Sequence, residues 1–347
     1  MDYQTAAVTG ATGHLGNVLV RELLRRDKRV TALVQPGDDC RALAGLGVDV
    51  MRGDVLRPET LRPAFAGVEL VFHLAGVVSI SSLDVAQVRT VNIEGTGNVV
   101  DAARKAGVGR LVYTSSVHAF TEPGRGGVLT EAAGYDPALA PGDYGKAKAA
   151  ASRIVLEAVR GGLDAVIVNP VAVLGPYDYR LSEMGELIRM YARQAMPAGV
   201  DGRYDFVDVR DVAAGHLLAA ERGRSGESYL LSGARMTVRE VMRILAEESG
   251  RRPPAFFLPL PLAASIAAFA PIFEKVTGRR ALLTPYSVHT ISVDFEIRDR
   301  KAREELGYTS MPVEQSLRDA WVWMTGDPDS PLNRPIQPSR PGRVAAS

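Results

Sequence analysis

The chain has 347 residues, of which 46% are hydrophobic, so it can bury a large core as one large domain or two coupled ones. Its 41 basic and 40 acidic side chains leave a formal net charge of +1, which argues against nucleic acid or another polyanion as a partner. The single Cys40 cannot form an internal disulfide, and no cysteine–histidine cluster has metal-ligand spacing, so no metal is expected. The first residues enter a strand without the basic and apolar regions of a cleaved signal, which predicts a soluble, cytoplasmic protein.

Three glycines at a spacing of three follow a short apolar strand at residues 6–9. Gly10 can turn sharply out of the strand, Gly13 lets the backbone approach a phosphate, and Gly16 lets the next helix pack closely on the sheet. That helix would point its free N–H groups and positive dipole end at the anion. The spacing is G-x-x-G-x-x-G, not the commoner G-x-G-x-x-G. A second strand at 29–34 completes a βαβ unit, so we expect a dinucleotide to bind here.

The residue after the second strand usually distinguishes NAD from NADP. A carboxylate there accepts the ribose 2′-OH of NAD, whereas an arginine pairs with the 2′-phosphate of NADP. This chain has Gln35, which is neither, and Asp38 and Asp39 follow in a Pro-Gly turn. The sequence therefore leaves the choice between NAD and NADP open.

The third strand, 48–51, is followed by Asp54, for which two roles fit. Asp54 could accept a hydrogen bond from the adenine amino group, or it could be an N-cap or turn aspartate. Residues 70–76 form a fourth strand that runs into a loop of small residues, and such a loop suits a flat nicotinamide ribose. We expect His73, by itself, to be a hydrogen-bonded structural residue and not a catalyst.

A helix is predicted from about residue 84 to residue 106, with Gly107 ending it. Asn92 is polar on an otherwise apolar face, so we expect it to satisfy backbone groups or to order water. A fifth strand, 111–114, ends in two serines. Because strands and helices alternate, the sheet should be parallel and doubly wound, with ligands outside the carboxyl ends of its strands.

Tyr144 and Lys148 are four residues apart on a predicted alanine-rich helix and so share one face. A nearby ammonium would lower the tyrosine pKa from about 10, which would let Tyr144 act as a general acid or base on a carbonyl or alcohol oxygen. Lys148 could also hold the nicotinamide ribose, while Ser115 or Ser116 orients the same oxygen. The same spacing occurs by chance on surface helices, but the glycine motif and the strand-end serines favour catalysis.

Together these motifs resemble those of the extended short-chain dehydrogenase/reductases, the NAD-dependent epimerase/dehydratase superfamily. The resemblance runs from about Ala6 to about Met324. The motifs that carry it are Thr9-Gly10-Ala11-Thr12-Gly13-His14-Leu15-Gly16, Gly53-Asp54-Val55, His73-Leu74-Ala75-Gly76, Tyr113-Thr114-Ser115-Ser116, Tyr144 with Lys148, and Asn169-Pro170 before Gly175-Pro176.

The resemblance implies a doubly wound fold, a nicotinamide cofactor and a catalytic triad of Ser116, Tyr144 and Lys148, with Ser115 as the alternative serine. The chain departs from the family at Gln35 and at Asn169, where sugar-nucleotide epimerases often have arginine. The residues implied to contact the cofactor are Gly10, Thr12, Gly13, His14, Leu15, Gly16, Gln35, Asp54, Val55, Leu74, Ala75, Gly76, Asn92, Thr114, Tyr144, Lys148 and Pro170.

The domain boundaries follow from the same resemblance. Residues 1–175 are the expected dinucleotide-binding domain, to which a segment at about 205–233 returns. Residues 176–204 and 234–325 are the expected substrate-binding part, which is smaller and mostly helical. The tail, 326–347, is rich in Pro, Ser and Arg and is expected to be disordered.

The most apolar stretch is 256–273, which prolines interrupt. We expect its helical part to be too short to span a bilayer and to form core plus the wall of an apolar substrate pocket. The alternative is a weak membrane-surface contact, which would suit a lipid-like substrate.

We therefore expect an NAD(P)-dependent oxidoreductase of the dihydroflavonol-reductase or 3β-hydroxysteroid-dehydrogenase type, acting on a small apolar ketone or secondary alcohol. One alternative is a sugar-nucleotide epimerase or dehydratase, for which Arg180, Arg189 and Arg203 are candidate diphosphate ligands. An alternative of another class is a non-catalytic NAD(P)-sensing regulator. We expect a monomer or a homodimer.

Overall fold

The computed structural model describes residues 3–196, 198–278, 280–281 and 283–326. Its centre is a seven-stranded sheet of order β11-β7-β5-β4-β1-β2-β3, in which every neighbouring pair is parallel. This confirms the predicted doubly wound fold. The strands are β1 (Thr5–Thr9), β2 (Arg29–Val34), β3 (Asp49–Arg52), β4 (Leu70–His73), β5 (Arg110–Thr114), β7 (Ala165–Pro170) and β11 (Ser228–Leu231).

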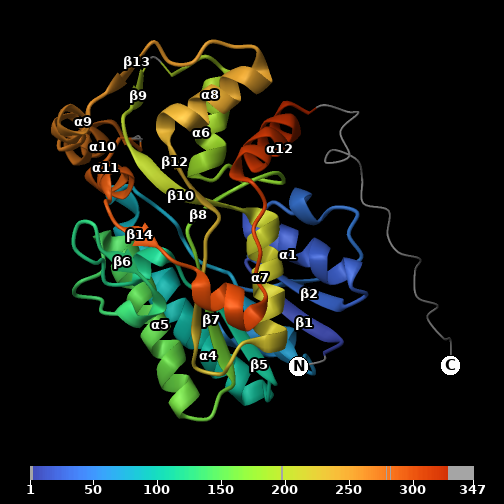
Figure 1. The fold of residues 1–347 in the computed structure, drawn as a ribbon. Helices are drawn as coiled ribbons and strands as arrows, with labels where there is room; N and C mark the ends of the chain where they lie inside the picture. The colour runs from blue at the N-terminus through green and yellow to red at the C-terminus, as the bar shows by residue number, and fades with distance from the viewer. Residues whose placement is uncertain (1–2, 197, 279, 282, 327–347) are drawn as a thin grey trace.

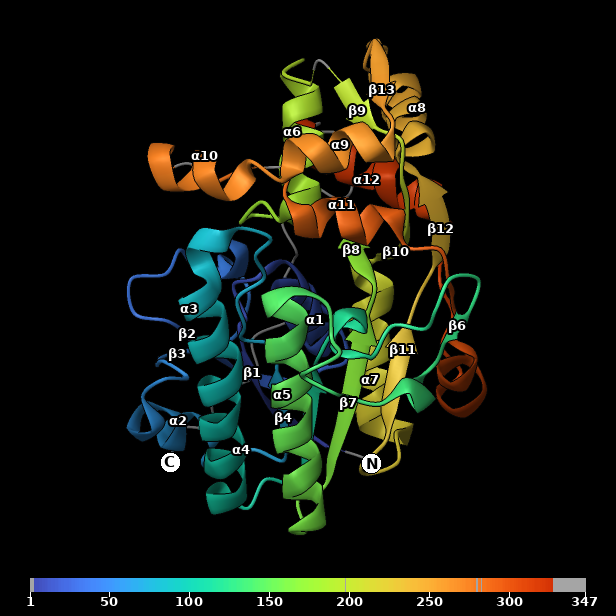
Figure 2. The same cartoon turned by 90° about the vertical axis from the view of Figure 1, so that its left-hand side faces the viewer.

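Helices cover both faces of this sheet (Figures 1 and 2). Successive strand residues point to opposite faces, so Phe72 packs with α1 and α7, whereas Val71 packs with the helices of the other layer. The helices of the first layer are α1 (His14–Arg25) and α7 (Val209–Arg222), and those of the second are α2 (Pro58–Phe65), α4 (Gly95–Ala106) and α5 (Gly142–Arg160). The carboxyl ends of the strands therefore form an edge that helices frame from both sides.

The helix predicted at 84–106 exists, but it is not uniform. A 3₁₀ turn at Ser82–Asp84 leads into α3 (Val85–Arg89), and a π-helical turn at Thr90–Glu94 joins α3 to α4. Gly107 ends the run with φ of +67°, as predicted. Asn92 lies within the π-helical turn, a type of distortion that often occurs at functional sites.

The smaller part of the chain lies beyond the carboxyl edge of the sheet (Figure 1). A capping box begins α8 (Val238–Ser249), because the Thr237 side chain accepts the Glu240 N–H and the Glu240 carboxylate accepts the Thr237 N–H. Of the segment expected to return to the large sheet, α7 and β11 pack there, while β10 (Arg203–Asp208) joins a small three-stranded sheet. The remaining elements are β6 (Val128–Leu129), β8 (Ala172–Leu174), α6 (Glu183–Ala192), β9 (Ala198–Val200), β10 (Arg203–Asp208), β12 (Ala234–Thr237), α8 (Val238–Ser249), β13 (Phe256–Leu258), β14 (Glu296–Ile297), a π-helical turn at Ala302–Leu306 and α12 (Val313–Thr325). The predicted disordered tail lies outside the described residues, apart from Gly326, which caps α12.

The apolar stretch forms α9 (Leu260–Ala267) and α10 (Ala270–Thr277), which precede α11 (Pro285–Ser292). Among the described residues, the one helical run long and apolar enough to cross a membrane is Leu260–Thr277, by length and composition only. It has 18 residues and a mean hydropathy of 1.3, and 22% of it is buried. The whole run is therefore longer than we expected, but Ala268 and Phe269 divide it into two helices of eight residues each. The run extends past Phe273 because Glu274, the first charged residue, is buried and hydrogen-bonded and does not end the helix.

Candidate active site

The glycine loop is as compact as a dinucleotide site requires. Gly10 has φ of +70°, and a Cβ there would lie 2.7 Å from the Ala75 nitrogen. A Cβ on Gly16 would collide with the Gly10 carbonyl oxygen. Gly13 caps α1 without a side chain, and the first turn of this fully described helix holds no acidic residue. The free N–H groups of that turn are open to an anion, so these residues fit a bound pyrophosphate.

The end of β2 offers both kinds of ribose contact. The Asp38 carboxylate accepts hydrogen bonds from the Thr12 hydroxyl at 2.5 Å and from the Arg180 guanidinium at 3.1 Å. The Arg52 guanidinium donates to the carbonyl oxygens of Gln35 and Asp38, at 3.2 and 3.4 Å. Beside Gln35 there is thus a carboxylate that suits a 2′-OH and guanidinium groups that suit a 2′-phosphate.

Several residues implied to contact the cofactor have partners in the protein. The His14 ring hydrogen-bonds the Pro176 carbonyl oxygen at 2.9 Å and so ties α1 to the start of the substrate part. The Asp54 carboxylate accepts the Leu56 N–H at 2.9 Å, which is the predicted turn interaction, and lies 3.4 Å from the Gln35 amide nitrogen. The adenine role of Asp54 stays a prediction.

His73 and Asn92 organise the loop after β4. The His73 ring hydrogen-bonds the hydroxyls of Thr9 at 2.8 Å and Thr96 at 3.1 Å, and burial lowers its pKa to about 3, so it is neutral. This confirms its structural role. The Asn92 side chain accepts the Val77 N–H at 3.1 Å and donates to the Val77 carbonyl at 2.8 Å. Asn92 therefore satisfies backbone groups, as expected, and fixes the small-residue loop in place.

Tyr144 lies in the first turn of α5 and Lys148 one turn later, close to the end of β5. The Lys148 ammonium donates a 2.5 Å hydrogen bond to the Thr114 carbonyl oxygen and lies 4.6 Å from the centre of the Tyr113 ring. Lys148 is buried, whereas Tyr144 is half-buried. The helix spacing thus brings both side chains to the carboxyl edge of the sheet.

The two serines at the end of β5 point to different partners. Ser115 forms a buried 2.7 Å hydrogen bond with Ser152, which in turn donates to the Lys148 carbonyl at 2.8 Å. Ser116 accepts the His118 N–H at 3.3 Å, and its hydroxyl lies near enough to Tyr144 to lower the pKa of the phenol. Ser116 is therefore the serine at Tyr144, and Ser115 ties β5 to α5.

Burial moves the two titratable groups in opposite directions. It raises the pKa of Tyr144 to about 12, against a smaller lowering by the nearby Ser116 hydroxyl. It lowers the pKa of Lys148 to about 7. We expected Lys148 to lower the tyrosine pKa, but its ammonium faces the Thr114 carbonyl and the Tyr113 ring, and loss of solvation dominates both groups.

Sequence reasoning missed an aromatic cluster beside Tyr144. The His118 ring stacks on Tyr204, whose hydroxyl is 2.7 Å from its Nε2, and lies 6.3 Å from the Tyr144 ring and 5.5 Å from the Tyr286 ring. Burial lowers the pKa of His118 to about 4, so the ring is neutral. The Tyr286 hydroxyl is buried without a hydrogen-bond partner among the described residues. Only the position of His118, two residues after Ser116, could have signalled this cluster from the sequence.

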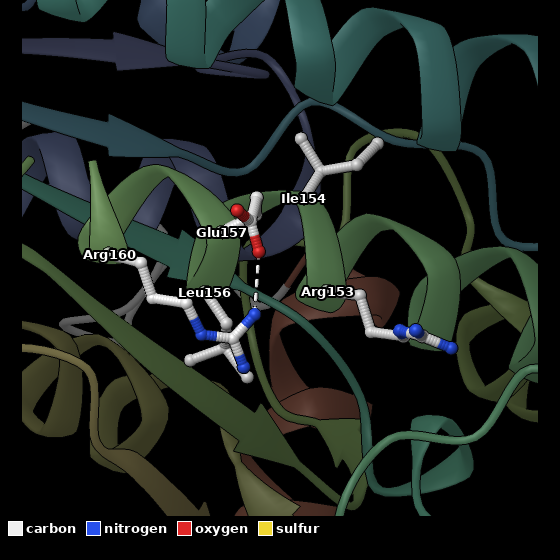
Figure 3. A pocket seen from close by; sticks show the side chains of 5 residues that line it. All are labelled: Arg153, Ile154, Leu156, Glu157 and Arg160. Atoms are coloured by element: carbon white, nitrogen blue, oxygen red, sulfur yellow. Dashed lines mark hydrogen bonds and ion pairs between the residues drawn. The ribbon is translucent and has the colours of Figure 1, made fainter.

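Two surface hollows lie along the outer side of α5, away from the catalytic residues. One, of about 320 Å³, is lined by Arg153, Ile154, Leu156, Glu157 and Arg160, the last two forming a 2.6 Å ion pair (Figure 3). The other, of about 610 Å³, includes Tyr135 and Lys301. Neither hollow is lined by Ser116, Tyr144 or Lys148.

Residues 6–232 match the model of the "NAD dependent epimerase/dehydratase family". The chain is 37% identical to sterol demethylase protein B of Methylococcus capsulatus, over 92% of this chain and 98% of that one. It is 31% identical to the 4-hydroxy-2-methyl-3-oxo-4-farnesyl-3,4-dihydroquinoline-1-oxide ketoreductase of Stigmatella aurantiaca, over 90% and 94%. The crystal structure of gox2253 superposes with a TM-score of 0.80 at 33% identity, over 93% and 98%. The chain thus belongs to the NAD-dependent epimerase/dehydratase family and is an NAD(P)-dependent oxidoreductase.

Proposed function

We propose that the protein interconverts an apolar ketone and the corresponding secondary alcohol. The observation that carries this proposal is the setting of Tyr144, which lies beside Ser116 and next to the cluster of His118, Tyr204 and Tyr286, whose histidine is neutral. Such a wall favours an apolar substrate with one oxygen directed at Ser116 and Tyr144. The name of the Stigmatella relative, a ketoreductase of a farnesylated ring, supports the same class.

The roles of the residues follow from their contacts. The glycine loop and Lys148 would hold the dinucleotide, and a bound nicotinamide supplies or accepts the hydride. The Ser116 hydroxyl donates a hydrogen bond to the substrate oxygen, and Tyr144 gives that oxygen its phenolic proton in the direction of reduction. Lys148, with a pKa of about 7, can restore a proton to the site at neutral pH.

The alternative of a sugar-nucleotide epimerase or dehydratase would need cations for a diphosphate. Each of the three candidates already pairs with a carboxylate: Arg180 with Asp38, Arg189 with Glu186, and Arg203 with Asp294. The family's solved sugar-nucleotide enzymes under 25% identity share only the fold with this chain. The paired arginines therefore support the ketone over the sugar nucleotide.

A substrate panel tests the proposal. The full-length protein is incubated with NADH or NADPH and with steroid ketones, farnesylated ring ketones and UDP-sugars, and cofactor oxidation and product are measured. We expect turnover of apolar ketones and none of UDP-sugars. Turnover of UDP-sugars alone would establish the alternative, and cofactor binding without any turnover would support the regulator.

A further inference from the structure

The helices α9 and α10 touch the rest of the protein along one narrow line each. In α9 the buried residues are Ala263 and Ala267, and in α10 they are Ala270 and Glu274. The large apolar side chains around the remaining circumference are between 48% and 79% exposed; they are Leu262, Ile266, Phe269, Ile272, Phe273 and Val276. A helix that is apolar on nearly all sides is typical of a protein interior or a membrane, and this one is not in the interior.

The shape of this segment favours the membrane surface over a full crossing. Ala268 and Phe269 separate two eight-residue helices, and Figure 2 shows α10 reaching outward from the body of the protein. Each helix is about 12 Å long, much shorter than the roughly 30 Å hydrocarbon core of a bilayer. Two short apolar helices of this kind can lie in the plane of the interface.

The charges of the segment favour an anionic surface. Between residues 256 and 278, all of which the structure describes, the ionisable side chains are Glu274 and Lys275. Glu274 is buried and accepts hydrogen bonds from the Ser82 N–H at 3.0 Å and the Ser82 hydroxyl at 2.5 Å. Lys275 is exposed. The segment thus presents apolar side chains and an ammonium to its surroundings, which complements the headgroups of anionic phospholipids.

The same segment adjoins the catalytic site on two sides. Ala263 and Ala267 pack with Val288 of α11, the helix that carries Tyr286. Glu274 holds Ser82, which follows the loop fixed by Asn92. Through its buried residues the segment therefore rests on elements that border the substrate oxygen and the expected nicotinamide.

We propose that α9 and α10 form a docking surface that inserts into the interface of anionic phospholipid bilayers. A second copy of the chain would cover one side of these helices, whereas a bilayer interface can cover the several exposed sides that they have. We further infer that the active site takes its apolar ketone directly from the bilayer, and this part rests on the proposed function.

Co-sedimentation with phospholipid vesicles tests the docking surface, without ketone or cofactor. The vesicles contain phosphatidylcholine alone or phosphatidylcholine with phosphatidylglycerol. We expect the wild-type protein to pellet with the anionic vesicles, and Phe269→Ser/Ile272→Ser to lower the partition coefficient by about 100-fold, or about tenfold for each residue. Two single variants at equally exposed side chains serve as a matched pair. Ile266→Ser lies in α9, where the side chain is 48% exposed, and Val50→Ser lies in β3, outside the proposed surface, where the side chain is 45% exposed. Only Ile266→Ser should weaken binding.

Three results would overturn the proposal: wild-type protein that stays in the supernatant, variants that pellet like the wild type, or Val50→Ser losing as much binding as Ile266→Ser. Sedimentation velocity tests whether a second copy of the chain covers this surface instead. If the wild type is a dimer, Phe269→Ser/Ile272→Ser is a monomer, and neither protein binds vesicles, the surface belongs to a dimer interface and the proposal is overturned. Circular dichroism and thermal unfolding verify that each variant folds. Because no substrate is present in this assay, a failure to bind vesicles does not contradict the proposed ketone reaction. A failure to turn over ketones likewise does not contradict vesicle binding.

Discussion

The two serines at the end of β5 give a matched pair of substitutions, because they differ in what their hydroxyls touch. In Ser116→Ala the substrate oxygen loses a hydrogen-bond donor where charge develops in the transition state. Such a bond contributes about 1.5–3 kcal/mol, so kcat/KM should fall by about 10- to 150-fold. In Ser115→Ala the loss is the 2.7 Å bond to Ser152, which keeps its bond to the Lys148 carbonyl. That change should cost about 1 kcal/mol of folding free energy and lower Tm by about 1–2 °C.

The assay compares kcat/KM for a turned-over ketone, the cofactor dissociation constant and Tm in wild type and both variants. We expect Ser116→Ala to lose activity with unchanged cofactor affinity, and Ser115→Ala to lose stability while keeping most activity. If Ser115→Ala lost the greater part of the activity and Ser116→Ala retained it, the assignment of the triad serine from the Tyr144 contact would be refuted.

Further predictions follow from the other contacts of the site. Burial lowers the pKa of Lys148 to about 7 in the folded protein, from 10.5 in the unfolded chain. Between about pH 7 and 10 the unfolded chain therefore binds one more proton than the folded protein, and the free energy of unfolding rises with pH. In urea unfolding, the free energy of unfolding of the wild type should rise by at most about 4 kcal/mol over this pH range, and that of Lys148→Met should not. Equal pH slopes for the two proteins would contradict this prediction. Gly142 has φ of +60°, and a Cβ there would lie 2.5 Å from the Tyr286 ring, whereas Gly126, with φ of +70°, has open space. Gly142→Ala and Gly126→Ala should each lose about 1–2 kcal/mol of stability, but only Gly142→Ala should also lose turnover. Equal turnover by the two variants would show that the position of the Tyr286 ring does not affect catalysis. Arg52→Ala should weaken NADPH binding by about tenfold and leave NADH binding unchanged in a fluorescence titration, and an equal loss for both would place Arg52 away from the 2′-position.

The fold was predictable because its signals are local. A glycine turn between a strand and a helix, and the regular alternation that follows, determine a parallel sheet and the edge where ligands bind. The Tyr144–Lys148 pair was predictable for the same reason, since a spacing of four places both side chains on one helix face. Gly107 marks a helix end by its own chemistry, and the structure has it there.

What the sequence could not show depends on contacts between distant segments. Tyr286 comes to the site because α11 packs beside the start of α5, more than a hundred residues earlier in the chain. The His14 ring bonds to a carbonyl at Pro176. The pKa of Tyr144 depends on how much protein surrounds it, and burial outweighs the charge of a lysine one turn away. No pattern within a short window encodes such contacts.

The same limit applies to the apolar stretch. Composition predicted that residues 256–273 are either core with a pocket wall or a membrane contact, but it did not place the end of their helical part. Burial of Glu274 against Ser82 lets α10 continue to Thr277. The partner that satisfies this carboxylate lies almost two hundred residues away, so the helix end could not be read locally.

The most direct test of the central claim is turnover by Tyr144→Phe, which removes the hydroxyl and keeps the ring. We expect kcat for an apolar ketone to fall by about 10²- to 10⁴-fold, the usual contribution of a general acid, while the dissociation constants of NADH and NADPH stay unchanged. A variant that turned over the same ketone at the wild-type rate would contradict the account, because Tyr144 would then not be the proton donor.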